Sequence, residues 1–203
     1  MISTIIFDVS EVLFQGLLGF EKVLSARLGQ QVPDNLLWEQ KEVQEFFRGQ
    51  RKELPMWQAV IDRYDWNTDP QELYGLVRQY FTPIQGTLDV ARELRQAGFM
   101  MGIISVHGRE WVHFLDTTWT YHEVFDHQSY SFQSGHLKPE TGAFMASLAG
   151  LNRIKPTGAG NCLFIDDSPV NIDAAKRLGF RAVLFRNAAQ LRHELAEKHG
   201  LLS

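Results

Sequence analysis

Close to its first residue the chain reads Ile5-Ile6-Phe7-Asp8-Val9-Ser10-Glu11-Val12-Leu13, in which a short apolar run is followed by a carboxylate. Far along the chain a second apolar run, Cys162-Leu163-Phe164-Ile165, is followed by two carboxylates, Asp166 and Asp167. Runs this short and apolar are typical of strands that are buried in a parallel sheet. The two stretches therefore favour an α/β fold with a parallel sheet.

The three carboxylates are predicted to meet. Ligands of an open parallel sheet bind beyond the carboxyl ends of its strands, so Asp8, Asp166 and Asp167 should converge at one edge. Carboxylates held that close repel one another unless a cation lies among them. The pattern indicates a site for a hard divalent ion, and Mg²⁺ prefers oxygen ligands of this kind.

Composition excludes several classes of partner. With 44% hydrophobic and 22% charged residues, the chain of 203 residues can build one core and a small accessory unit of an ordinary soluble protein. Its formal net charge of -4 gives no basic field for nucleic acid or an anionic membrane. No apolar stretch reaches the roughly 18–20 residues of a membrane span, and no basic leader is present. A single cysteine, Cys162, fits a reducing compartment, so we expect a cytoplasmic protein.

Apolar runs alternate with helix-like segments, which is typical of βαβ units. The predicted strands span residues 4–7, 99–105, 128–131, 162–165 and 182–185. The predicted helices that follow them span residues 88–97, 109–116, 140–149, 170–178 and 188–199. Together these elements predict a Rossmann-like parallel sheet that is covered by helices.

Residues 15–82 contain no strand pattern. Helices are predicted there at residues 20–28, 36–47, 55–64 and 70–80. Four consecutive helices exceed what one crossover between parallel strands needs. We therefore expect a core of residues 1–14 and 83–203, with residues 15–82 as a helical cap. Alternatively, these helices cover one face of the main sheet.

The predicted cap is rich in aromatic residues, most of which we expect in the core of its helical bundle. One or two of them could instead face the site at the sheet edge and shape it. The aromatic residues are Phe20, Trp38, Phe46, Phe47, Trp57, Tyr64, Trp66, Tyr74 and Tyr80.

Four short motifs, in order along the chain, resemble those of the haloacid dehalogenase (HAD) superfamily. They are Asp8 after the first strand, Ser105 at the end of Gly102-Ile103-Ile104-Ser105, Lys138 before Pro139, and the pair Asp166-Asp167. Each motif alone is weak, but the four together form a specific pattern that covers nearly the whole chain. The resemblance implies a Rossmann-like core with an inserted helical cap. The subgroup that the chain resembles most is that of capped phosphatases acting on sugar phosphates or similar monoesters.

The resemblance implies a role for each motif. Asp8 would be the nucleophile that forms an aspartyl-phosphate, which splits one difficult step into two easier ones. Ser105, Lys138 and the backbone amide of Val106 would bind the phosphoryl group and stabilise its charge. The substrate would then be a small phosphorylated metabolite.

The same resemblance implies a metal site. Mg²⁺ would be held by Asp8, Asp167 and the backbone carbonyl of Ser10. Asp166 would be a further ligand or would orient Lys138. Beside this cluster, Asn171 could hydrogen-bond the acids or face solvent, and we expect His107 to be a surface loop residue.

Ser10 departs from the family pattern, because most such phosphatases carry an aspartate there as the general acid and base. A serine hydroxyl has too high a pKa to act as a general acid near neutral pH. The chain could therefore turn over slowly, act on substrates with good leaving groups, or use another acid such as Glu11 or a cap residue. The alternative function is that of a weakly active or inactive phosphate-binding protein.

A 2-haloacid dehalogenase is a further, less favoured alternative. Halide leaves without a proton, so the absence of a general acid would do no harm. That chemistry needs no metal, however, and Asp166 and Asp167 would then be two unneutralised carboxylates beside the nucleophile. Ser10 also differs from the tyrosine that this branch usually carries.

Overall fold

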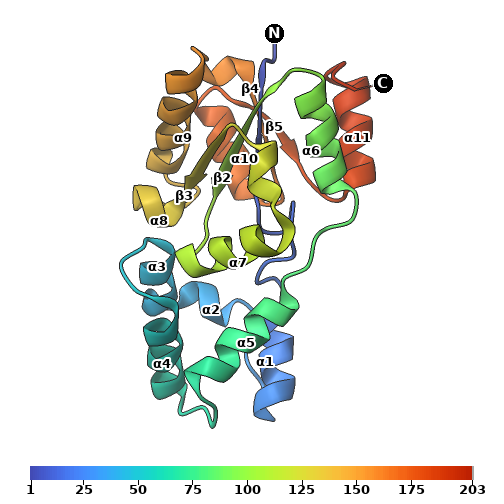
Figure 1. The fold of residues 1–203 in the computed structure, drawn as a ribbon. Coiled ribbons are helices and arrows are strands. Elements are labelled where there is room, and N and C mark those ends of the chain that lie inside the picture. The colour runs from blue at the N-terminus through green and yellow to red at the C-terminus, as the bar shows by residue number, and fades with distance from the viewer. Residues whose placement is uncertain (203) are drawn as a thin grey trace.

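The computed structural model describes residues 1–202, and its centre is one five-stranded sheet. All strand pairs are parallel, in the spatial order β3-β2-β1-β4-β5 (Figure 1). The strands are β1 (Thr4–Phe7), β2 (Met100–Ser105), β3 (His127–Tyr130), β4 (Cys162–Asp166) and β5 (Arg181–Leu184). This arrangement confirms the predicted α/β fold with a parallel sheet.

β1 lies at the middle of the sheet, between β2 and β4. Its side chains alternate between two apolar layers: Ile5 and Phe7 pack into one cluster of buried residues and Ile6 packs into the other. Both faces of β1 are therefore covered, which explains why its sequence is continuously apolar rather than alternating.

Helices cover both faces of the sheet. α9 (Thr141–Ile154) and α10 (Pro169–Arg177) supply Phe144 and Ile172 to the same cluster as Ile6, whereas Leu94 and Leu191 lie in the other. Figure 1 shows α9 and α10 on one side of the sheet and α6 with α11 on the other. The remaining elements here are α6 (Thr87–Gln96), α7 (Arg109–Trp119), α8 (Ser131–Ser134), α11 (Ala188–Glu197) and the 3-10 helices η1 (Tyr121–Val124) and η2 (Ala159–Asn161).

The strands were predicted to within one residue at each end, but the ends of several helices differ by two or more residues. The third strand ends at Tyr130, because Ser131 instead begins the short helix α8. The helix that was predicted to end at residue 149 continues to Ile154, since Gly150 does not interrupt it.

Residues between β1 and α6 form five helices without a strand. Figure 1 shows these helices grouped at one end of the sheet. They are α1 (Phe20–Leu28), α2 (Leu36–Glu39), α3 (Lys41–Phe47), α4 (Glu53–Tyr64) and α5 (Pro70–Tyr80). We call residues 15–82 the helical segment. No helix within residues 1–202 is both long enough and apolar enough to cross a membrane.

The helix predicted over residues 36–47 is broken into α2 and α3. Gln40 has an extended backbone, with φ -79° and ψ 129°, and its side-chain amide donates a 2.8 Å hydrogen bond to the carbonyl of Leu36. That side chain satisfies a carbonyl at the end of α2, so the chain can turn there. As a result Trp38 lies in a helix of four residues.

The helical segment and the sheet share one apolar core. Phe46 and Trp57 belong to the same buried cluster as Phe7, and Trp111 of α7 lies between them. Ring centroids of Phe46 and Trp111 are 4.9 Å apart. A Cβ on Gly108 would lie 1.8 Å from Phe46, so only glycine fits where α7 begins.

A buried carboxylate reinforces this junction. Glu53 of α4 is 1% exposed, and its oxygens accept hydrogen bonds from the indole of Trp111 at 2.7 Å and from the guanidinium of Arg78 at 2.7 and 2.8 Å. Trp57 donates to the same carboxylate at 3.3 Å. The charge of Glu53 is therefore paired and hydrogen-bonded, as a buried charge must be.

Candidate active site

The sheet brings three carboxylates together at its carboxyl edge. Phe7 is the register partner of Ile165, and the amide of Asp8 donates a 2.9 Å hydrogen bond to the carbonyl of Ile165. Asp8 therefore lies beside Asp166, which ends β4, and Asp167 follows. One carboxylate oxygen from each of the three aspartates lies within 4.8 Å of the others.

Lys138 lies between two of these acids. Its Nζ is 2.7 Å from Oδ2 of Asp8 and 2.6 Å from Oδ2 of Asp166. Its side chain is 2% exposed. Burial alone would lower the pKa of Lys138, but the charges of Asp166 and Asp8 outweigh burial and raise the pKa. The lysine is therefore a buried positive charge at neutral pH.

Asp166 is fully buried and surrounded by donors. Its Oδ1 accepts hydrogen bonds from the amide of Ser168 at 2.9 Å and from Nδ2 of Asn171 at 2.9 Å. Its Oδ2 accepts from Lys138 at 2.6 Å and from Asn171 at 3.2 Å. Of the two orientations that the sequence left open for Asn171, the structure shows the one toward the acids.

Asp8 and Asp167 are less well neutralised. Burial raises the pKa of Asp8, and the charges of Asp166 and Asp167 add to this effect against the attraction of Lys138. Burial and the charge of Asp166 raise the pKa of Asp167 to about 6. With one lysine among three acids, the cluster retains excess negative charge that a cation would relieve.

Ser105 lies at the end of β2, where the sequence placed it. It is 2% exposed, and its Oγ has no hydrogen-bond partner within the described residues 1–202. Val106 follows it and lines the cavity beside the three acids. A buried hydroxyl without a partner is costly, so this one is available to a bound group.

The expectation that His107 is a surface residue was wrong. It is 2% exposed, because the rings of Phe81 and Trp111 pack against it with centroids 6.0 and 5.9 Å away. Burial and the charge of Lys138 lower its pKa to about 3. The imidazole is therefore neutral, and its Nε2 lies 3.5 Å from Oγ of Ser10.

Glu11 ties the helical segment to the site. Its Oε1 accepts hydrogen bonds from the amides of Gly16 at 3.0 Å and Leu18 at 2.9 Å. Burial raises its pKa, although these two hydrogen bonds lower it. This carboxylate anchors the turn that leads into α1.

A cavity of about 390 Å³ opens beside the acids, and the helical segment forms part of its wall. Ser10 and Glu11 also border it. The sequence did not single out Leu17, Leu18 or Asn35 as wall residues, because all three lie in the turns just before α1 and α2, where no periodic pattern shows which residues face the sheet. The lining residues are Asp8, Ser10, Glu11, Leu17, Leu18, Asn35, Trp38, Val106, Lys138, Pro139, Asp167, Ser168, Val170 and Asn171.

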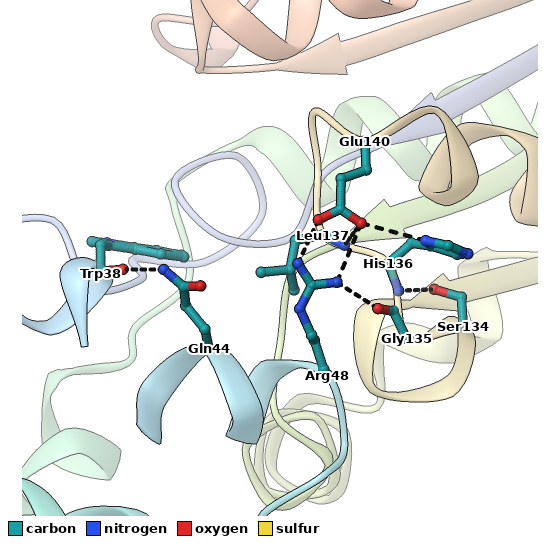
Figure 2. A network of polar contacts seen from close by, with 8 residues as sticks. All are labelled: Trp38, Gln44, Arg48, Ser134, Gly135, His136, Leu137 and Glu140. Atoms are coloured by element: carbon teal, nitrogen blue, oxygen red, sulfur yellow. Dashed lines mark hydrogen bonds and ion pairs between the residues drawn. The ribbon is translucent and has the colours of Figure 1, made fainter. Parts of the chain in front are cut away.

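A polar network joins α3 to the loop that carries Lys138 (Figure 2). Arg48 donates to the carbonyl of Gly135 at 2.6 Å and forms an ion pair with Glu140. Glu140 also accepts from the amide of Leu137 at 3.3 Å. Sequence reasoning missed this network, because its partners are far apart along the chain.

The donor set fits a hard divalent cation. Asp8 and Asp167 border the cavity, and carboxylate oxygens within 4.8 Å of one another can reach a common ion. The cluster contains no cysteine or histidine that would favour a softer metal. The oxygens of Asp166 are already engaged by Lys138, Asn171 and Ser168.

Solved structures share this fold. A HAD-like family hydrolase from Porphyromonas gingivalis superposes with a TM-score of 0.75 at 21% identity, covering 97% of this chain and 99% of that one. A HAD family enzyme from Bacteroides thetaiotaomicron, in complex with magnesium and inorganic phosphate, gives 0.71 at 14% identity, with coverage of 92% and 96%. A HAD phosphatase from Thermococcus onnurineus gives 0.63 at 19% identity, with coverage of 96% and 98%.

Comparison of the amino-acid sequence with known proteins identifies the family. No curated protein matches the chain. The family model described as haloacid dehalogenase-like hydrolase, however, matches residues 5–185, which include all four motifs and the helical segment. The chain therefore belongs to the haloacid dehalogenase-like hydrolases.

Proposed function

We propose that this hydrolase is a Mg²⁺-dependent phosphatase of a small phosphate monoester. The observation that carries the proposal is the buried group of Asp8, Lys138 and Asp166 at the carboxyl edge of the sheet, with Asp167 beside it. The names of the similar structures support it, because one contains magnesium with inorganic phosphate and another is called a phosphatase.

Asp8 is the proposed nucleophile. Its Oδ1 is fixed by the amide of Val9 at 2.7 Å and its Oδ2 by Lys138, so the carboxylate has one defined orientation. Attack on phosphorus would give an aspartyl-phosphate, which water then hydrolyses. The hydroxyl of Ser105, the ammonium of Lys138 and the amide of Val106 would donate hydrogen bonds to the phosphoryl oxygens.

Asp8, Asp167 and the carbonyl of Ser10 are the proposed protein ligands of Mg²⁺. A bound magnesium ion would offset the charge of the acids and of the phosphoryl oxygens. Because the oxygens of Asp166 are occupied, we assign this residue to orienting Lys138 rather than to the metal.

The helical segment is proposed as a cap, with residues 1–14 and 83–203 as the catalytic core. In support, Leu17, Leu18, Asn35 and Trp38 form one wall of the cavity that contains Asp8. A wall of this kind excludes water and selects the organic part of the substrate. The hydrogen bonds of Glu11 to the amides of Gly16 and Leu18, and that of Arg48 to the carbonyl of Gly135, would fix the position of this wall relative to the catalytic residues.

Ser10 favours one second candidate, a phosphate-binding protein with little turnover. Nε2 of His107 lies 3.5 Å from the hydroxyl of Ser10, but the pKa of this histidine is lowered to about 3, so the imidazole is neutral at pH 7. A neutral, fully buried imidazole is a poor proton donor to a leaving group. Hydrolysis would therefore depend on how well the leaving group departs without a proton.

The experiment compares pure protein with Asp8→Asn, using para-nitrophenyl phosphate, an alkyl phosphate and inorganic phosphate, with Mg²⁺ or with a chelator. The phosphatase proposal expects Mg²⁺-dependent turnover that falls by on the order of 10⁴ in Asp8→Asn, since an amide is no nucleophile. Phosphate binding without turnover of either ester would support the second candidate. Release of halide from a 2-haloacid in the presence of chelator would contradict both.

A further inference from the structure

The cavity beside Asp8 has an exposed apolar rim. We define this rim as Leu18, Trp38 and Val170, which are 67%, 38% and 59% exposed and all line the cavity. Within residues 1–202, only three other large apolar side chains are classed as exposed, and none lines this cavity. Single apolar residues on a surface are ordinary, but three around one opening mark contact with an apolar ligand.

Trp38 is held in place within this rim. Its ring packs against that of Phe47, with centroids 5.0 Å apart and a tilt of 33°. Its carbonyl accepts a 3.2 Å hydrogen bond from the side-chain amide of Gln44 (Figure 2). The indole is thus a fixed aromatic surface at the mouth of the cavity, which suits a flat aromatic partner.

The charges around the cavity exclude a second anionic group on the ligand. Among residues 1–202, Lys138 is the only cationic side chain that lines it, and both of its short contacts are with Asp8 and Asp166. Glu11 and Asp167 add negative charge to the wall. A carboxylate or second phosphate on the organic part would meet repulsion and no partner.

The chemistry at Ser10 restricts the leaving group independently. Without an acid to protonate the leaving oxygen, that oxygen must depart as an anion. A phenol ionises with a pKa of about 10, as tyrosine does, whereas the pKa of a simple alcohol, like that of water, is far higher. A phenolate is therefore a far better leaving group than an alkoxide.

We propose that the substrate is the phosphate monoester of an uncharged phenol, whose ring rests on the apolar rim. This inference depends on the proposed phosphatase function and narrows its substrate. An oxygen of Asp8 bonds to phosphorus while the bond between phosphorus and the aryl oxygen breaks. The phenolate leaves with that electron pair and takes a proton from solvent. Water then attacks phosphorus, the bond to Asp8 breaks, and the net products are phenol and phosphate.

Four phosphate compounds separate ring binding from leaving-group quality. Three are esters: phenyl phosphate, benzyl phosphate with a ring on an alkyl oxygen, and 4-carboxyphenyl phosphate with an extra charge. The fourth is acetyl phosphate, an acyl phosphate that has a good leaving group but no ring. Phenyl phosphate should have a KM about tenfold below that of acetyl phosphate. Benzyl phosphate should inhibit competitively but turn over at least about 10²-fold more slowly. The carboxylate should raise KM about tenfold.

Two variants test the rim itself. Trp38→Ala should raise the KM for phenyl phosphate about tenfold more than the KM for acetyl phosphate. Leu18→Lys adds a cation and should improve kcat/KM for 4-carboxyphenyl phosphate about fivefold relative to phenyl phosphate. Met145, an exposed residue of α9 away from the cavity, supplies the matched controls Met145→Ala and Met145→Lys. Neither control should change these ratios.

The outcomes are distinct. If wild-type protein hydrolyses none of the four compounds, the phosphatase function fails and this inference fails with it. If benzyl phosphate turns over as fast as phenyl phosphate, or if the KM for acetyl phosphate is no higher than the KM for phenyl phosphate, the inference is wrong and the phosphatase function stands. The same holds if Trp38→Ala is without effect. Should circular dichroism show that Trp38→Ala is unfolded, the ratio measured with Leu18→Lys decides.

Discussion

Lys138 supplies one positive charge beside three carboxylates, those of Asp8, Asp166 and Asp167. The charges at the ends of β1 and β4 therefore do not cancel, and an excess of negative charge remains. Protons and Mg²⁺ are the two kinds of cation that can restore the balance. They compete for the same carboxylate oxygens, because a metal ligand must be deprotonated. The competition gives the site a predictable dependence on pH.

We predict that Mg²⁺ binds more tightly as the pH rises from 5 to 7. The pKa of Asp167 is raised to about 6 in the metal-free protein, so this carboxylate is protonated below that pH and ionised above it. Each proton that Mg²⁺ displaces costs up to about tenfold in affinity per pH unit below the pKa. Isothermal titration calorimetry at several pH values measures the change. Asp167→Asn should weaken binding and remove the part of this dependence that comes from Asp167, leaving the part that comes from Asp8, whose pKa burial also raises.

The absence of an acid at Ser10 gives a second prediction at this scale. Ser10→Asp should raise kcat for an alkyl phosphate by about 10² to 10⁴, because a general acid there protonates the leaving oxygen. It should change kcat for para-nitrophenyl phosphate much less. Ser10→Ala is the matched control and should leave both rates near wild type. An unchanged alkyl phosphate rate in Ser10→Asp would show that another group, such as Glu11, already acts as the acid.

The positions of individual residues were predictable where a strand fixes them. Asp8, Ser105 and Asp166 end three parallel strands, and strand ends meet at one edge whatever the rest of the chain does. His107 was misjudged because Phe81 and Trp111, which bury it, are distant or on the next helix. Such contacts leave no local signal in the sequence.

At the scale of elements, the buried carboxylate of Glu53 joins α4 to α5 by an ion pair with Arg78 and to α7 by a hydrogen bond from Trp111. Glu53→Ala would leave the guanidinium of Arg78 and the indole of Trp111 without their acceptor. Removing one partner of a buried pair costs about 3–5 kcal/mol, so the free energy of unfolding in urea should fall by that amount. The control is Asp89→Ala, which removes an exposed pair with Arg92 and should cost about 1 kcal/mol or less. Equal losses in the two variants would contradict this role of Glu53.

The contact of α3 with the Lys138 loop is weaker and depends on pH. The hydrogen bond and charge of Arg48 lower the pKa of Glu140. The stabilisation is therefore complete above the unfolded pKa of Glu140 and is lost as the pH falls through the lower folded pKa. Arg48→Ala should cost about 1 kcal/mol or less in urea unfolding at pH 7, since the pair is partly exposed.

That cost should shrink once the pH falls below the lowered folded pKa of Glu140, where this carboxylate is protonated in the folded protein as well. Arg48→Ala should also lower kcat/KM under conditions in which the variant stays folded. The reason is that Arg48 holds the carbonyl of Gly135 in the loop that carries Lys138. A cost that stays constant from pH 7 to pH 3 would show that Glu140 is not the partner that matters.

Element types were predictable, but some boundaries were not. The broken helix at Gln40 depends on one side chain that bonds the carbonyl of Leu36, and helical periodicity alone does not reveal such a contact. The break also decides where Trp38 lies. For this reason the sequence could suggest that an aromatic residue faces the site, but could not say which one.

At the scale of the whole molecule, a parallel sheet covered by helices was predictable from the alternation of apolar runs and helical segments, whereas the order of the strands was not predicted. The interface between the helical segment and the sheet was not predictable either, because it depends on shape. The rings of Phe46 and Trp57 pack against Trp111 of α7, and the sequence does not show which aromatic residues of the helical segment make these contacts.

The glycine at position 108, which touches Phe46, limits how modular this architecture is. A chimera that replaces residues 15–82 with the corresponding piece of a relative would place foreign side chains against Gly108 and Trp111. Larger side chains would collide there, and smaller ones would leave a void. A chimera designed to exchange substrate specificity should therefore replace the first turn of α7 together with residues 15–82.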